Sequence, residues 1–236
     1  MKAILITGSN RGLGQEFVKQ YLEKGNVIIA TCRNPGKAIG LQHLSRLFPE
    51  TLSIFQLDVT NAEHRNQLFN QISKEFGKLD MLINNAGIIS GNTNKIYNFG
   101  EIHKEDFMKV LEVNTLAPLL MSEKFSKLLE KSSEAKIINI TSSNGSISRR
   151  SSKGKYSYCV SKAALNMVSK ILSNDLRDMG IAVIALQPGW IKTDMGGSNA
   201  PMELEETISV LINLINNITI SDTGKFLNWD GSELPW

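Results

Sequence analysis

Short apolar runs alternate with longer amphipathic stretches along the whole chain. The stretches between the runs have the 3.6-residue periodicity of helices, whereas the runs have the length of buried strands. Strands that alternate with helices form βαβ units, in which helices cover both faces of a parallel sheet. The pattern therefore predicts an α/β fold with a doubly wound parallel sheet. Its strands are expected at residues 3–6, 27–30, 52–55, 81–83, 137–140 and 182–186.

The longest helical candidates are residues 104–131 and 156–179, and residues 203–215 form a weaker one. Pro118 is expected to kink or disturb the first of them, because proline lacks the N–H that an inner helical turn needs. Residues 88–100 and 193–201 have no regular pattern and are predicted loops. Loops at the carboxyl ends of parallel strands commonly hold the substrate, although the first of these loops could equally be a surface linker.

Composition narrows the class of protein. The chain has 236 residues, of which 42% are hydrophobic, and this length fits a single domain over residues 1–236. The 26 basic and 23 acidic residues leave a net charge of only +3, and the basic residues are scattered, so we expect neither a nucleic-acid nor a membrane partner. Cys32 and Cys159 are too few for a disulfide framework, which indicates a reducing compartment.

Targeting and metal signals are weak. Only four apolar residues follow Lys2 before Thr7, too few for a signal peptide, and no stretch approaches the length of a membrane span. We therefore expect a cytoplasmic protein. The three histidines, His43, His64 and His103, lie far apart without a second ligand at metal-binding spacing, so no metal site is expected.

A glycine-rich turn links the first apolar run to the first helix. Its sequence is Thr7-Gly8-Ser9-Asn10-Arg11-Gly12-Leu13-Gly14. Glycines let the backbone approach a pyrophosphate, whose charge the N–H groups and dipole of a helix N-terminus offset. Three glycines alone are weak evidence, since strand-to-helix packing could also require them. Placed after a strand, however, they predict a Rossmann-type sheet that binds a dinucleotide through Gly8, Asn10, Arg11, Gly12, Leu13 and Gly14.

The end of the second strand indicates which dinucleotide. In this fold it faces the adenosine ribose, where a carboxylate favours NAD(H) and a basic residue favours the added phosphate of NADP(H). Here the segment offers Arg33 and no acidic residue. A guanidinium binds phosphate bidentately, and Arg11 could reach the same group. We therefore predict NADP(H), although Arg33 alone could be a solvated surface residue.

Two further segments lie at strand ends where the cofactor should pass. Asp58 and Val59 follow the third strand; Asp58 could accept a hydrogen bond from the adenine amino group or, equally, cap the helix expected near Asn61. Residues Asn85, Ala86 and Gly87 follow the fourth strand and supply small side chains beside the cofactor. Taken alone, this second segment is also typical of a simple turn.

Several motifs together resemble the short-chain dehydrogenase/reductase family, in the same order and at similar spacing. They are Thr7-Gly8-x-x-x-Gly12-x-Gly14, Asn84-Asn85-Ala86-Gly87, Asn114, Ser142, Tyr158-x-x-x-Lys162 and Pro188-Gly189. The resemblance covers nearly the whole chain, and only Tyr158 among the tyrosines has a lysine four residues later. The end of the chain, from Gly224 to Trp236, resembles the carbonyl-reductase-like branch that includes sniffer and C-factor proteins.

This resemblance implies a catalytic set of Asn114, Ser142, Tyr158 and Lys162. Tyr158 would be the general acid and base. Lys162, one helical turn away, and an oxidised nicotinamide would together lower the pKa of Tyr158 towards neutrality, and Lys162 would also hold the nicotinamide ribose. Ser142 would polarise the carbonyl, with Ser143 as its competitor. Both serines could instead be turn formers.

Asn114 would bind a water that connects Lys162 to solvent for a proton relay. On the sequence alone, an asparagine inside a helix more often bonds its local backbone and bends the helix. The resemblance further implies that Pro188, Gly189, Ile191 and Thr193 hold the nicotinamide, although a bare Pro-Gly pair also marks a turn.

One departure from the family pattern concerns the substrate side. Tyr158 follows Ser142 by sixteen residues, whereas the family spacing is about thirteen. The difference indicates an insert at residues 148–155, which is basic and could attract an anionic substrate or could be a solvated loop. The short Gly-rich stretch after Thr193 implies a small or open lid.

These observations lead to one expected function and two alternatives. We expect NADPH-dependent reduction of a small-molecule carbonyl compound (an aldehyde, ketone or quinone) to an alcohol. One alternative is a dinucleotide-binding signalling or regulatory protein of the C-factor type. The other is an NAD-dependent alcohol dehydrogenase, against which Arg33 argues. A homodimer or homotetramer could form through the two long helices, but the core needs their apolar faces equally.

Overall fold

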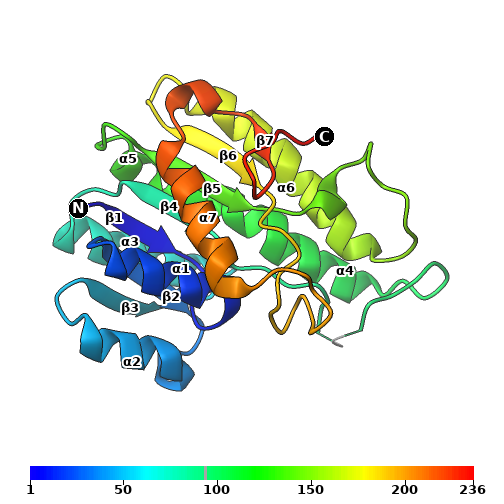
Figure 1. The fold of residues 1–236 in the computed structure, drawn as a ribbon, viewed down its shortest axis with the longest axis horizontal. Helices are drawn as coiled ribbons and strands as arrows, with labels where there is room; N and C mark the ends of the chain where they lie inside the picture. Colours follow the sequence, from blue (N-terminus) through cyan, green and yellow to red (C-terminus); the bar gives the residue numbers. More distant parts are fainter. Residues whose placement is uncertain (93–94) are drawn as a thin grey trace.

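A computed structural model describes residues 1–92 and 95–236, and its centre is a seven-stranded parallel sheet (Figure 1). The strand order is β3-β2-β1-β4-β5-β6-β7, so the chain leaves β1 in one direction and returns to its other side at β4. This reversal confirms the predicted doubly wound sheet. The strands are β1 (Ala3–Ile6), β2 (Val27–Cys32), β3 (Leu52–Gln56), β4 (Met81–Asn84), β5 (Lys136–Ile140), β6 (Ala182–Leu186) and β7 (Phe226–Leu227).

The predicted strands are all present. Two have the predicted bounds, and the others are longer by one or two residues, such as Cys32 and Gln56, which pair with each other in the ladder between β2 and β3. The sequence did not predict β7, because its two residues are too few for a periodicity. It pairs with β6 through Phe226 and Leu227.

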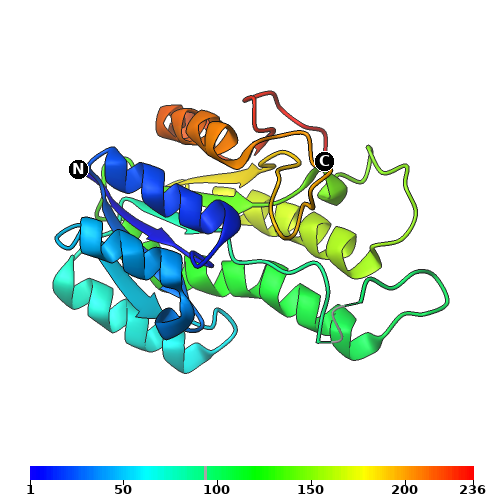
Figure 2. The same ribbon diagram turned by 60° about the horizontal axis from the view of Figure 1, so that its bottom comes forward.

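Helices cover both faces of the sheet, as predicted (Figures 1 and 2). Helix α1 packs against α2 and α7 on one face, while α3 packs against α5 and α4 against α6 on the other. The helices are α1 (Gly12–Glu23), α2 (Ile39–Leu47), α3 (Ala62–Glu75), α4 (Lys104–Leu111), α5 (Ala117–Leu129), α6 (Tyr156–Asp175) and α7 (Leu204–Asn217).

The core consists of two apolar layers, one on each side of the sheet. Alternate residues of a strand point to opposite faces, so Ile4 and Ile6 of β1 belong to the layer that contains Phe17 of α1. Leu5, between them, belongs to the layer that contains Phe125 of α5. Because both faces are buried, the strands are continuous apolar runs rather than alternating ones.

The helix predicted over residues 104–131 is interrupted by a turn of π-helix at Glu112–Leu116. Pro118 lies in the first turn of α5 and has no N–H to donate to the carbonyl of Asn114, four residues earlier. The ladder adjusts locally, and the N–H of Ala117 donates to Glu112 O, five residues back. The expected disturbance by Pro118 is confirmed.

The predicted loops lie at the carboxyl edge of the sheet. Residues 88–92 and 95–100 contain no helix or strand, and residues 93–94 of that prediction lie outside the described residues. Residues 193–201 are also irregular, and an isolated bridge pairs Ile191 with Met202 on either side of them. Among the described residues, no helix is long and apolar enough to cross a membrane.

Candidate active site

The glycine-rich turn leads from β1 into α1 and packs tightly against the segment after β4. Gly8 has φ +68°, and a Cβ atom there would lie 2.8 Å from Ala86 Cα. A Cβ atom on Gly14 would lie 2.3 Å from Gly8 O. Close packing therefore requires both glycines, as the alternative based on strand-to-helix packing predicted. Arg11 is the N-cap residue of α1 and makes no side-chain cap, and the first turn of α1 has no acidic residue, which suits an anion.

Thr7 connects this turn to the residues after β4. Its Oγ1 accepts hydrogen bonds from Asn85 N and Ala86 N, each at 3.0 Å. In return, Asn85 Nδ2 donates to Thr7 O at 2.9 Å and to Gly8 O at 3.1 Å. Two predicted cofactor segments are thus held side by side. Thr7 is the first residue of the glycine motif, but its role in joining the two segments was not predicted.

The structure does not bring the two arginines predicted for the phosphate to one partner. Arg11 Nη1 pairs with Asp194 Oδ2 at 2.7 Å, in the loop after β6, and both side chains are largely exposed. Arg33 is exposed at the end of β2. No carboxylate of the described residues lies within ion-pair distance of its guanidinium. Arg33 is therefore available to an anion, whereas Arg11 has an acidic competitor.

Asp58 does not cap α3, so that alternative is wrong. The N-cap residue is Asn61, whose Oδ1 accepts from Glu63 N and His64 N. Asp58 Oδ1 instead accepts from the N–H and hydroxyl of Thr60, at 2.9 and 2.7 Å. Although burial raises the pKa of Asp58, these hydrogen bonds outweigh it and leave the pKa below its ordinary value. The contact of Asp58 with the adenine stays a prediction. So does cofactor binding by Val59, whose carbonyl accepts a hydrogen bond from Arg65.

Ser142, Tyr158 and Lys162 come together where β5 ends and α6 begins. Ser142 lies beside Tyr158 and lowers the pKa of its phenol, and the Ser142 hydroxyl accepts from Asn144 N at 3.1 Å. Lys162 Nζ donates to Ile140 O at 2.8 Å and lies 5.8 Å from the centre of the Tyr158 ring. Ser142, the serine that we preferred over Ser143, both forms the turn and contacts Tyr158.

Burial dominates the acidity of this pair. It raises the pKa of Tyr158, and Ser142 offsets the rise only in part. Burial also lowers the pKa of Lys162 to about 8. Desolvation disfavours the charged phenolate, and Lys162 is not among the groups that shift the pKa of Tyr158. The lowering expected from Lys162 together with an oxidised nicotinamide stays a prediction.

Asn114 lies fully buried in the π-helical turn. Its Oδ1 accepts from Ile88 N at 2.8 Å, and its Nδ2 donates to Ile88 O at 2.7 Å and to Ser161 Oγ at 3.0 Å. It therefore bonds the loop after β4 rather than the backbone of its own helix, so that alternative is wrong. A Cβ atom on Gly87 would lie 3.4 Å from Asn114 Oδ1 and 3.7 Å from Lys162 Nζ, so these residues share one region.

The segment after β6 lies against the glycine-rich turn. Gly189 has φ +99°, Ile191 is buried, and a Cβ atom on Gly12 would lie 3.7 Å from Thr193 Cγ2. Thr193 Oγ1 accepts from Gly196 N at 3.1 Å. Asn10 is exposed beside the turn, whereas Leu13 packs against the core. Three of the segments predicted to hold the cofactor, those after β1, β4 and β6, thus lie in contact at the carboxyl edge of the sheet.

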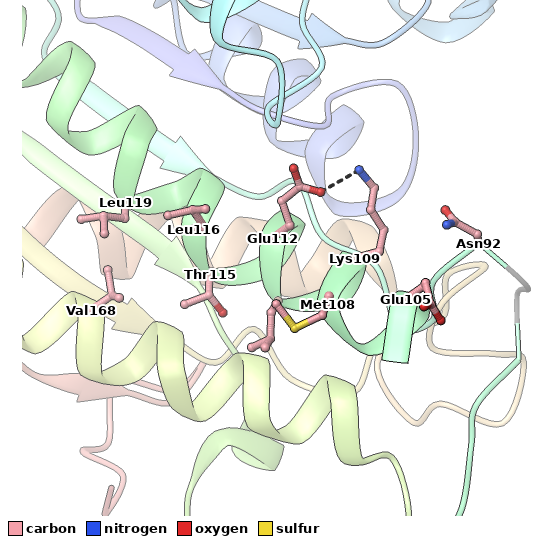
Figure 3. Close-up of a pocket in the computed structure, with 10 residues that line it drawn as sticks. Asn92, Glu105, Met108, Lys109, Glu112, Thr115, Leu116, Leu119 and Val168 are labelled. Carbon is pink, nitrogen blue, oxygen red and sulfur yellow. Dashed lines mark hydrogen bonds and ion pairs between the residues drawn. The ribbon is translucent and has the colours of Figure 1, made fainter. Parts of the chain in front are cut away.

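A groove of about 580 Å³ lies elsewhere, on the outward side of the π-helical turn (Figure 3). Leu116, Leu119 and Val168 line its apolar part, and Lys109 pairs with Glu112 at 2.9 Å at its other end. None of the predicted site residues lines this groove. It runs between the two long helices that we considered for self-association.

Comparison with known proteins identifies the class. A family model described as short chain dehydrogenase matches residues 2–204, so the chain belongs to the short-chain dehydrogenase family.

Within this family the chain is similar to carbonyl reductases, which confirms the predicted branch. It is 33% identical to the carbonyl reductase Sniffer of D. melanogaster, with a TM-score of 0.94 and coverage of 100% of both chains. It is 35% identical to the NADPH-bound carbonyl reductase from chicken fatty liver, with a TM-score of 0.93 and coverage of 100% of this chain and 99% of that one. It is also 33% identical to the C-signal of Myxococcus xanthus over 160 residues, which cover 68% of this chain and 94% of that protein.

Proposed function

We propose that the protein uses NADPH to reduce an aldehyde, ketone or quinone to an alcohol. The observation that carries the proposal is the convergence of Ser142, Tyr158 and Lys162 next to the glycine-rich turn, with Lys162 Nζ 5.8 Å from the centre of the Tyr158 ring. Similarity to carbonyl reductases, one of them NADPH-bound, supports the choice of reaction and cofactor.

The residues at the sheet edge fit a dinucleotide. Glycine at positions 8 and 14 lets the turn pack closely on Ala86 and on itself, and the N–H groups at the start of α1 can meet a pyrophosphate. Arg33 has the geometry and charge for the added phosphate of NADP(H). When bound, NADPH supplies a hydride to the carbonyl carbon. The proposed binding residues are Gly8, Asn10, Arg11, Gly12, Leu13, Gly14, Arg33, Asp58, Val59, Asn85, Ala86, Gly87, Tyr158, Lys162, Pro188, Gly189, Ile191 and Thr193.

Tyr158 is the proposed general acid. Its raised pKa keeps the phenol protonated at neutral pH, which is the form that must give a proton to the carbonyl oxygen as that oxygen gains negative charge. Ser142, which lies beside the phenol, can donate to the same oxygen. Lys162 and Asn114 are the proposed route for returning a proton, since both lie within 4 Å of the space beside Gly87.

The test is carbonyl-dependent oxidation of NADPH, followed by absorbance over a panel of aldehydes, ketones and quinones. Tyr158→Phe should lower kcat at least about 100-fold while NADPH binding and the melting temperature are retained. Tyr156→Phe is the matched control, because Tyr156 is exposed two residues earlier on α6 and its loss should change kcat less than twofold, or about 0.4 kcal/mol. Equal activity of the two variants would reject the role of Tyr158.

The similarity to C-signal supports a second candidate, a dinucleotide-binding signalling protein. In that case NADPH would bind, no carbonyl of the panel would be reduced, and Tyr158→Phe would leave the biological function intact.

An NAD-dependent alcohol dehydrogenase would instead prefer NAD⁺ with alcohols. Arg33, which pairs with no carboxylate of the described residues, argues against the choice of NAD⁺.

We further propose that residues 1–236 act as one domain in the cytoplasm, on a small-molecule substrate. Continuity of the seven-stranded sheet supports a single domain. Exposed Met108 and Leu116 beside the groove support a homodimer or homotetramer, which sedimentation would distinguish from a monomer.

A further inference from the structure

The insert at residues 148–155 is strongly basic and lies at the carboxyl edge of the sheet. Arg149, Arg150, Lys153 and Lys155 are its only charged residues. In Figures 1 and 2 the insert is the yellow-green loop that arches away from the body and returns to the start of α6. It therefore leads directly into the helical turn that carries Tyr158.

Arg150 anchors the insert to the proposed catalytic residues. Its Nη1 donates to Asn144 Oδ1 at 2.9 Å, and the N–H of Asn144 donates to the Ser142 hydroxyl at 3.1 Å. Its Nη2 donates to Gly154 O at 2.8 Å and to Lys153 O at 3.3 Å. One guanidinium thus closes the loop and ties it to the serine that contacts Tyr158.

Further contacts hold both ends of the insert. Ser148 N donates to Trp236 O at 3.3 Å at the first end. At the second end, Gly154 packs closely against Asn98 of the loop after β4, since a Cβ atom on Gly154 would lie 2.6 Å from Asn98 Oδ1. Lys155 has φ 56° and is the N-cap residue of α6. The insert is therefore an anchored arm whose position relative to Tyr158 is defined.

The other three cations of the insert are not paired with a carboxylate of the described residues. Arg149, Lys153 and Lys155 are exposed, and within residues 1–92 and 95–236 no carboxylate lies within ion-pair distance of any of them. The charges of the insert act on the first turn of α6, where Arg150 and Lys155 lower the pKa of the Cys159 thiol, which burial raises overall. Cys159 follows Tyr158 directly. Unpaired charges of one sign beside a site attract ligands of the opposite sign.

Resting on the proposed function, we propose that this arm selects carbonyl substrates that carry a carboxylate. Arg149, Lys153 and Lys155 attract and hold the carboxylate, and Arg150 fixes their distance from the Ser142 and Tyr158 side chains. The arm acts on substrate affinity, whereas proton transfer remains with Tyr158.

The experiment compares two substrates of nearly equal shape, 4-carboxybenzaldehyde and its neutral methyl ester. The variant Arg149→Gln/Lys153→Gln/Lys155→Asn removes three charges and places at 155 a residue that tolerates positive φ. The control Lys24→Gln/Arg46→Gln/Lys74→Gln removes three exposed charges elsewhere and gives the same net charge. Both are assayed for KM and kcat with NADPH at low and at high salt.

We expect the arm variant to raise KM for the acid about 5- to 10-fold at low salt. Its KM for the ester and its kcat should match those of the wild type, and high salt should reduce the difference. Equal KM changes for acid and ester, or an equal effect of the control, would overturn the proposal and leave a solvated loop. Reduction of neither substrate would count against the arm's role with this pair; if the whole carbonyl panel failed as well, the proposed function itself would fall.

Discussion

Lys162 lies beneath Tyr158 with its ammonium nitrogen 5.8 Å from the ring centre, and it donates its hydrogen bond to Ile140 O at 2.8 Å. The four-residue spacing on α6 predicted their shared face. Burial lowers the pKa of the lysine to about 8. The fold thus holds a costly charge at the centre of the proposed site, as functional sites often do.

This burial makes stability depend on pH. The pKa of Lys162 is about 8 in the folded protein and 10.5 in its ordinary environment, so between these values the unfolded chain binds more protons and the free energy of unfolding rises with pH. Relative to Lys162→Met, the wild type should gain about 2 kcal/mol from pH 7.5 to pH 9.5. Urea unfolding at the two pH values measures this difference.

Other titrating groups cancel in that comparison, because both proteins contain them. Lys136, whose pKa burial also lowers to about 8, contributes equally to both. A difference between wild type and Lys162→Met that stays constant or shrinks as the pH rises would contradict the lowered pKa.

Arg33 should determine the choice of cofactor. Arg33→Ala is expected to raise KM for NADPH about 30-fold, because a charge-assisted phosphate contact is lost. KM for NADH should hardly change. Arg177→Ala removes an exposed arginine that follows α6 and serves as the control. An unchanged ratio of the two KM values in Arg33→Ala would remove the assignment of Arg33 to the phosphate.

The sequence predicted the elements that local pattern defines. β1 and β6 have the predicted bounds because their apolar runs are continuous and fully cross the buried sheet. The effect of Pro118 followed from its missing N–H. The π-helical form of the disturbance could not be predicted, because it depends on which N–H groups donate to the neighbouring carbonyls.

Features that depend on distant contacts were not predictable. Arg11 and Asp194 are 183 residues apart, and no local pattern pairs two exposed side chains on different loops. The raised pKa of Tyr158 reflects its burial in the folded protein. The four-residue spacing of Tyr158 and Lys162 carries no information about that burial. Likewise, the sequence indicates only that Arg150 belongs to a basic insert, and its hydrogen bond to Asn144 follows from the fold.

Breaking the Arg11–Asp194 ion pair should change the KM for NADPH but not the stability of the protein. Exposed ion pairs contribute about 0–1 kcal/mol, so Asp194→Asn should leave the urea midpoint nearly unchanged. Because the change frees Arg11 and removes a negative charge near the glycine-rich turn, KM for NADPH should fall about 2- to 3-fold, more at low salt. A rise in KM would mean instead that the pair positions the loop for the cofactor.

Gly8 and Gly25 separate backbone strain from close packing. Both have positive φ, +68° and +75°, but a Cβ atom on Gly25 would meet nothing within 4 Å. Gly25→Ala should cost about 1 kcal/mol from the left-handed conformation alone. Gly8→Ala should cost about 3 kcal/mol, because its methyl group also meets the Ala86 backbone. Equal urea midpoints would show that the turn can move away from residues 85–86.

Asn114 should stabilise the folded protein as well as support the proposed proton relay. Asn114→Ala leaves Ile88 N and Ile88 O without the partners they have now, and two unsatisfied part-buried groups cost about 2 kcal/mol. Asn213→Ala, at an exposed position on α7, should instead stabilise slightly through helix propensity. Urea unfolding measures both, and kcat is compared at a temperature where circular dichroism shows each variant folded. A stable Asn114→Ala protein would mean that water replaces the amide, whereas an unstable protein with full kcat would leave Asn114 a purely structural role.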